Sequence, residues 1–198
     1  MKRLHRLYGL LAVAAATLAH AEDAKPVQAR WQAKEIQATF SGLHTAYNCD
    51  AVEHRIKRLL IALGTHRNTH VLVSGCGLNK IASTFFIHIA TAASVPLAQA
   101  GTSDAKEELL RRLGSQNAYG SDAFPAVWKT VDLTRLKGLN FEPGDCELLQ
   151  LIQDQILPKL GAEVPANRLH CAPGSPLVRL PPLNVTMLAP APVPEKAP

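Results

Sequence analysis

The chain has 198 residues, of which 47% are hydrophobic, and it carries a formal net charge of +5. This length suffices for one domain with a real hydrophobic core, so the fold need not depend wholly on cross-links. The sequence has no clustered basic face of the kind that nucleic-acid-binding surfaces require, so we expect no nucleic-acid partner.

The first 21 residues have the organisation of a secretory signal peptide. Three basic residues precede an apolar run from Leu7 to Leu18, and Ala19-His20-Ala21 follows as a cleavage signal. The apolar run is too short to span a bilayer. We expect a mature chain that begins at Glu22, is periplasmic or secreted in a bacterium, and has no membrane span. Removal of the signal takes three basic residues and lowers the net charge to +2.

Hydrophobic periodicity in the mature chain predicts two helices, each with a strand before and after it. The expected elements are a strand over 35–47, broken or bulged near Gly42, a helix over 49–63, strands over 70–74, 83–93 and 126–133, a helix from 146, and short strands over 169–171 and 183–188. The chain is expected to divide into a signal peptide over 1–21, one domain over 22–188 and an Ala/Pro-rich disordered tail over 189–198. The domain begins with a loose segment over 22–32 and carries an insertion over 97–124.

The helix ends have recognisable local signals. Asn48 is a suitable N-cap for the first helix, and Gly64 suits a left-handed C-terminal stop. Asp145 is the expected N-cap of the second helix. Pro158 removes a backbone hydrogen bond inside that helix, so we expect the helix to end near Ile156 or to kink there.

Four cysteines predict two disulfides, Cys49–Cys76 and Cys146–Cys171. Disulfides are favoured in an exported chain, although the sequence alone permits three connectivities. Each helix opens on a cysteine, and in a right-handed strand–helix–strand crossover the next strand returns to the edge where the helix began. A cysteine that closes this strand therefore lies near the one that opens the helix.

The expected fold class is α+β. Two main helices lie on one face of a mostly antiparallel sheet of five to seven strands, held by two disulfides. The two helices match in their apolar positions and both end on a glycine, which indicates a weak repeat of a strand–helix–strand–strand unit. We expect a ferredoxin-like arrangement or a doubled relative of it.

No motif in the sequence points to a reaction or to a cofactor. The cysteines form no C-x-x-C pair, and P-loop, G-x-G-x-x-G and G-x-S-x-G patterns are missing. His66 and His70 are weak candidate metal ligands because they are four residues apart. They fall in a loop that leads into a strand, where this spacing means little, and a metal site needs further ligands.

Three aromatic residues are candidates for a binding surface: Trp31, Tyr47 and Trp128. Trp128 falls within a predicted strand. A core or half-buried position is therefore the simpler interpretation for it, because aromatic side chains commonly fill sheet faces.

Most of the mature chain outside the insertion and the tail resembles a set of uncharacterised exported proteins of proteobacteria. The segments that carry the resemblance are Tyr47-Asn48-Cys49-Asp50, Arg55-Ile56-Lys57-Arg58-Leu59-Leu60, Leu63-Gly64, Gly75-Cys76, Gly144-Asp145-Cys146-Glu147-Leu148 and Ile156-Leu157-Pro158. That family has no assigned activity, so the resemblance supplies no catalytic residue.

The leading hypothesis is a non-enzymatic, disulfide-stabilised periplasmic module that binds an exported protein or a small molecule. One alternative is an exported enzyme whose site is assembled from distant residues such as His44, Ser74 or His88, near the insertion. A second alternative is a weak metal-binding protein that uses His66 and His70.

Overall fold

A computed structural model describes residues 25–42, 45–99, 122–139, 141–164, 169–171 and 179–192. The strands are β1 (Val27–Ser41), β2 (Tyr47–Asn48), β3 (His70–Ser74), β4 (Ile81–Ala82), β5 (Thr84–Pro96), β6 (Phe124–Asp132) and β7 (Asn184–Pro190). The helical elements are α1 (Cys49–Leu63), α3 (Cys146–Leu151), η4 (Ile152–Ile156), α4 (Leu157–Leu160) and the short turns η1 (Leu97–Gln99), η2 (Leu133–Arg135) and η3 (Pro143–Asp145). Within the described residues, five antiparallel strands form a sheet in the order β3-β5-β1-β6-β7, and β2 pairs with β4.

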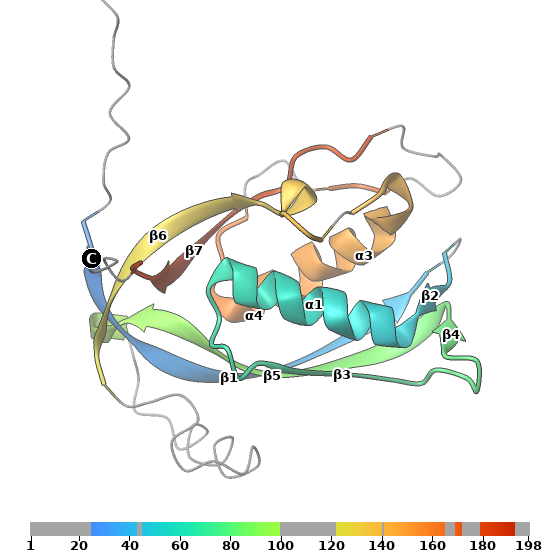
Figure 1. Cartoon of the computed structure of the whole chain (residues 1–198), viewed down its shortest axis with the longest axis horizontal. Coiled ribbons are helices and arrows are strands. Elements are labelled where there is room, and N and C mark those ends of the chain that lie inside the picture. Colours follow the sequence, from blue (N-terminus) through green and yellow to red (C-terminus); the bar gives the residue numbers. More distant parts are fainter. Residues whose placement is uncertain are drawn as a thin grey trace, which may run out of the picture.

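The main sheet consists of two wings that meet along a short seam. β1 pairs with β5 from Ala29 to Ser41, but it pairs with β6 only from Val27 to Ala29. Ala29 and Ala126 are completely buried at this seam, where small side chains let the strands approach. Figure 1 shows β6 and β7 arching over the helices while β1, β5 and β3 run beneath them. The helices therefore lie on one face of a strongly curved sheet.

The second helix, formed by α3, η4 and α4, lies in the angle between the wings. Its side chains supply hydrogen-bond partners to backbone groups along the open edge of β1. The amide of Gln155 accepts from the Thr39 N–H (3.1 Å) and donates to the Thr39 carbonyl (3.3 Å). The Lys159 ammonium donates to the Gln37 carbonyl (2.6 Å). These side chains replace the backbone partners that a neighbouring strand would otherwise supply to an exposed edge.

The first helix begins and ends where the sequence predicts. The Asn48 side chain accepts a hydrogen bond from the Ala51 N–H at 3.0 Å, and Gly64 has a left-handed backbone with φ 98°. One face of α1 is buried against the inner face of the β1-β5-β3 wing. The helix contributes Val52, Ile56, Leu59, Leu60 and Leu63 to this core, and the sheet contributes Ile36, Phe40, Val71, Phe85, Ile87 and Ile89. Each such side chain stabilises the fold by about 1.5–3 kcal/mol when fully buried.

Pro158 disturbs the second helix without ending it. The turn over η4 is π-helical, and the chain then continues as α4 to a left-handed Gly161. Proline cannot donate to the helical ladder and crowds the preceding turn, so a widened turn just before it relieves both problems. The second helix is therefore distorted at the predicted place, near Ile156, but it does not end there.

Several predicted strands were wrong in extent. β1 begins at Val27, inside the segment that was expected to be loose. It ends at Ser41 and pairing resumes at β2, so the break beside Gly42 is one of the two predicted alternatives. Residues 169–171 form no strand, because the Leu169 and Cys171 N–H groups donate to the side chains of Gln153 and Gln150 on the second helix. In the described part of the second half, one strand of the expected repeat is therefore not found.

The α+β class is confirmed, with an antiparallel five-stranded sheet, two helices and two disulfides. The ferredoxin-like topology is not shown. β5 lies between β1 and β3, as in half of such a fold, but the second helix follows β6 and leads to β7 at the sheet edge. The signal peptide over 1–21, residues 100–121 of the insertion and residues 193–198 of the tail lie outside the described residues, and β7 runs to Pro190.

Both predicted disulfides are present. Cys49 and Cys76 have Cα atoms 6.6 Å apart, and Cys146 and Cys171 have Cα atoms 5.8 Å apart. Cys49–Cys76 joins the opening of α1 to the end of the returning strand β3, as the crossover argument requires. Cys146–Cys171 likewise joins a helix opening to a returning segment, but that segment is not a strand.

The double substitution Cys49→Ser/Cys76→Ser should lower the free energy of unfolding by about 3 kcal/mol, because it releases a loop of 27 residues in the unfolded chain. Urea unfolding of the oxidised protein measures the loss. Cys146→Ser/Cys171→Ser, which releases 25 residues, provides a matched comparison. A peptide map without reductant that joins Cys49 to Cys146 would contradict the pairing.

Gly64→Ala should be more destabilising than Gly161→Ala. Both glycines have left-handed backbones, which costs an alanine roughly 1–2 kcal/mol. A Cβ at position 64 would also lie 2.5 Å from the Cβ of Ala189, whereas nothing lies within 4 Å of one at position 161. We expect Gly64→Ala to lose at least about 1 kcal/mol more in urea unfolding. Equal losses would contradict the close approach of α1 to β7.

Candidate functional site

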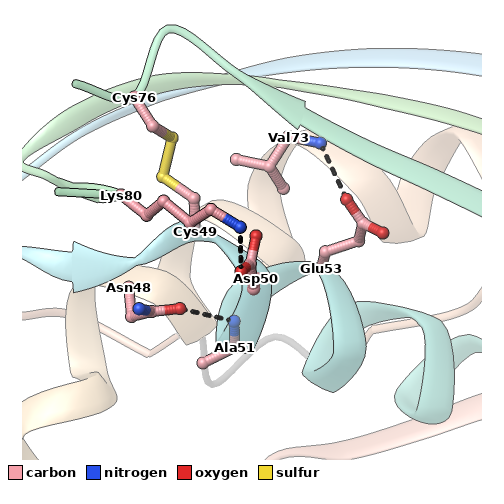
Figure 2. A network of polar contacts seen from close by, with 8 residues as sticks. All are labelled: Asn48, Cys49, Asp50, Ala51, Glu53, Val73, Cys76 and Lys80. Atoms are coloured by element: carbon pink, nitrogen blue, oxygen red, sulfur yellow. Dashed lines mark hydrogen bonds and ion pairs between the residues drawn. A yellow bond between two sulfur atoms is a disulfide. The ribbon is translucent and has the colours of Figure 1, made fainter. Parts of the chain in front are cut away.

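The polar groups at the start of α1 serve the architecture. Figure 2 shows the Cys49–Cys76 disulfide beside an ion pair between Lys80 Nζ and Asp50 Oδ2 (2.7 Å). The hydrogen bond and negative charge of Asp50 raise the pKa of Lys80. The Val73 N–H donates to the Glu53 carboxylate at 3.4 Å, which covers one backbone donor on the outer edge of β3. These contacts hold the loop after Cys76 against the helix.

A partly buried ion pair joins the first helix to the start of the second. Arg55 Nη1 donates to Asp145 Oδ1 at 2.7 Å, and Asp145 Oδ2 accepts from the Glu142 N–H at 2.9 Å. The Asp145 side chain is only 9% exposed, and the Arg55 guanidinium lies 5.9 Å from the centre of the Phe141 ring. Asp145 is the N-cap residue of α3, as predicted, but its side chain makes no capping bond to that helix. Its carboxylate instead binds the arginine of α1.

Tyr47 is a structural residue at the same junction. Its hydroxyl donates to the Gly144 carbonyl (3.0 Å), and its ring packs edge-on against Phe40. Burial raises the pKa of Tyr47 far above its ordinary value, and the negative charges of Asp145 and Glu147 add to this effect. The hydroxyl therefore stays protonated and acts as a hydrogen-bond donor.

Trp31, another aromatic candidate, forms the wall of a hollow of about 370 Å³, here called the Trp31 hollow. It is lined by Trp31, Ile61, Gly64, Thr65, His66, Arg67 and Pro190. The Trp31 ring lies 4.8 Å from the Phe124 ring and 5.1 Å from the edge-on His66 ring. Side chains from β1, the last turn of α1, the following loop and the end of β7 thus form one small aromatic surface.

The loop that carries His66 is held in place by buried hydroxyl groups. The Thr69 hydroxyl donates to the His66 carbonyl at 2.6 Å and lies within hydrogen-bond distance of the hydroxyls of Thr65 and Thr91. His66 Nδ1 accepts from the Asn68 N–H at 3.1 Å. Burial, with the nearby charge of Arg67, lowers the pKa of His66. The imidazole is therefore neutral near pH 7 and adds to the uncharged wall of the hollow.

A second hollow, of about 380 Å³, lies beside the second helix. Its lining residues are Thr39, Phe40, Ser41, Glu147, Gln150, Leu151, Asp154, Gln155 and Cys171. The Glu147 Oε2 atom is buried there without a hydrogen-bond partner among the described residues. Glu147 and Asp154 are seven residues apart on one helix, about 10 Å along its axis, so they do not form a close carboxylate pair.

The third hollow, of about 330 Å³, lies on the outer face of the β1-β5-β3 wing. It is lined by Glu35, His70, Val71, Leu72, His88, Ile89 and Ala90. Of the residues suggested for an enzyme, Ser74 and His88 lie on this same open face, and His44 lies outside the described residues. Convergence of the three is therefore not observed.

The two predicted metal ligands are not brought together. His66 packs against Trp31, whereas His70 points outward from β3. Across the described ranges, no group of three or more His, Cys, Asp or Glu side chains is gathered for a metal ion. Sequence reasoning missed the neighbour that His70 does have, which is His88 on the adjacent strand.

No protein-family model, curated protein or solved structure matches this chain. The resemblance to exported proteobacterial proteins therefore stays a prediction. Two disulfides favour a compartment outside the cytoplasm. In the described part of the chain, no helix has the length and apolarity needed to cross a membrane.

Arg55→Met should lower the free energy of unfolding by about 2 kcal/mol, because it leaves the buried Asp145 carboxylate without its cation; water at the partly exposed arginine moderates the loss. The double variant Arg55→Met/Asp145→Asn should lose less than the sum of the single variants. Urea unfolding in a double-mutant cycle measures this coupling. Asp50→Asn, which removes the exposed Lys80 ion pair, is the control and should leave stability unchanged. Additive losses at Arg55 and Asp145 would contradict the pairing.

Proposed function

We propose that this protein is a non-catalytic binding module of the bacterial periplasm or extracellular space, and that the Trp31 hollow is its ligand site. The observation that carries the proposal is the hollow itself, an aromatic-walled depression built by three separate segments of a disulfide-braced fold. Its volume of about 370 Å³ falls in the range of small-molecule sites.

The wall of the hollow favours a flat apolar group. Trp31 is supported from one side by Phe124, so its ring is held in place before a ligand arrives. Ile61 is 39% exposed beside it, on the helix face that otherwise carries polar residues such as His54 and Lys57. Aromatic rings stack on such surfaces, and preorganised side chains lose little freedom on binding.

The rim of the hollow favours an acidic group on the same ligand. Arg67 is exposed at the rim, and the neutral His66 places no second positive charge inside. A guanidinium forms directional, paired hydrogen bonds with carboxylate, sulfonate or phosphate groups. The ligand class that fits is therefore a small molecule with a flat apolar ring and one acidic group. An exported protein that presents an aromatic side chain beside an acidic one would fit in the same way.

The signal-peptide pattern over residues 1–21, the two disulfides and the resemblance to exported proteobacterial proteins support the proposed compartment. The polar residues at the braced end of α1 already have structural contacts that account for them, which agrees with a non-catalytic role.

Binding of the dye 1-anilinonaphthalene-8-sulfonate, an aromatic ring system with one sulfonate, tests the proposal on the folded, disulfide-bonded mature chain. We expect a saturable rise in dye fluorescence that Trp31→Ala reduces at least tenfold in affinity. Trp128→Ala is the matched control, since Trp128 is 42% exposed on β6 and lies outside the hollow.

Arg67→Gln should weaken this dye but leave its uncharged analogue N-phenyl-1-naphthylamine unaffected, because only the sulfonate needs the cation. Thermal unfolding of each variant shows that the fold is kept. Dye binding that is indifferent to Trp31→Ala would refute the assignment of the hollow as the ligand site.

A further inference from the structure

The strand register places three metal-binding side chain types around one small residue on the outer face of the sheet. Ala90 in the middle strand β5 faces His70 on β3 and Glu35 on β1. His88 lies two residues before Ala90 on β5, so its side chain points to the same face. Ala90 is thus bordered by His70, His88 and Glu35 on three sides.

The space above Ala90 is a real depression. The third hollow, of about 330 Å³, is lined by all four of these residues. A methyl group surrounded by longer side chains leaves room above itself for an ion and its water. His70, His88 and Glu35 are all exposed, so their side chains can turn toward this space without disturbing the core.

The distances between these strand positions suit a shared ion. Residues directly opposite in an antiparallel pair have Cβ atoms about 4.5–5.5 Å apart, and diagonal neighbours about 7–8 Å, within reach of long side chains. His88 faces Leu72 and Gln37, so it is the diagonal neighbour of both His70 and Glu35. Two imidazole nitrogens and a carboxylate can therefore meet above Ala90 by side-chain rotation.

We propose that His70 and His88, with Glu35 as third ligand, bind a divalent transition-metal ion such as Zn²⁺ above Ala90. Two imidazoles and one carboxylate, with water in the fourth position, are an established ligand set for this ion. In the described side-chain arrangement the three groups are not yet gathered. The site is therefore assembled when the ion binds, by rotation of three exposed side chains on a fixed backbone.

This site differs from the His66 and His70 pair that the sequence suggests. His66 belongs to the loop after α1 and packs on Trp31, whereas His88 enters only through the pairing of β3 with β5. The proposal is independent of ligand binding in the Trp31 hollow, because the two sets of lining residues share no member.

Metal binding would also change the mechanics of the sheet. Among the described strands β3 lies at the sheet edge and pairs with β5 alone, so an ion held by His70, His88 and Glu35 would join three strands on the face opposite the helices. An ion that binds the folded state alone raises its apparent stability. The melting temperature therefore provides a readout that is separate from affinity.

Calorimetric titration of ZnCl₂ into the tag-free mature protein tests the proposal. We expect one ion per chain and a rise in melting temperature. His70→Ala and His88→Ala should each weaken Zn²⁺ at least tenfold and abolish the thermal shift, and Glu35→Gln should weaken it less. His54→Ala, which removes an exposed histidine of α1, is the control and should leave both readouts unchanged.

The Cu²⁺ complex gives a direct view of the ligands. Electron paramagnetic resonance should show two nitrogen ligands in the unaltered protein and one in either histidine variant. Absence of Zn²⁺ and Cu²⁺ binding at millimolar ion would overturn the proposal. Binding that survives both His70→Ala and His88→Ala, or that is lost in His66→Gln, would overturn it as well, since the ion would then lie elsewhere.

Discussion

The open edge of β1 is the constraint on which the arrangement of this protein depends. Beyond Ala29, β6 leaves β1 and the sheet divides into two wings, so within the described part of the chain no strand lies beside the outward backbone groups of Gln37 and Thr39. Backbone donors and acceptors need partners. Gln155 and Lys159 supply them from the second helix, which holds that helix in the angle between the wings and gives the molecule its arched form (Figure 1).

Along α1, the braced end is separate from the proposed ligand site. The disulfide, the N-cap and the Arg55 ion pair all act on its first half, whereas the Trp31 hollow lies beside Gly64 at its far end. A helix of 15 residues is about 22 Å long. The braced end fixes the helix against the second half of the chain, and the other end lies beside the aromatic wall of the Trp31 hollow. Binding residues are commonly carried by loops that a rigid scaffold holds in place.

The two halves of the chain are similar but not equivalent. Each helix opens on a disulfide cysteine and ends on a left-handed glycine. In the first half the returning segment is the strand β3, which pairs with β5. In the second half residues 169–171 are held by glutamine side chains and the disulfide instead. The first half therefore contributes a wing of three strands, β1, β5 and β3. Within the described residues, the second half contributes only β6 and β7.

The sequence by itself determined the helix ends, the disulfide pairs and the α+β class. Caps such as Asn48 and Gly64 act through neighbouring residues, and the pairing of Cys49 with Cys76 follows from the direction of a crossover connection. Only the tertiary structure decided what Asp145 binds, what Trp31 lines and which histidine lies beside His70. These depend on strand register and on contacts between distant segments. A shift of register by one residue would turn every side chain of a strand to the other face, and no local pattern specifies it.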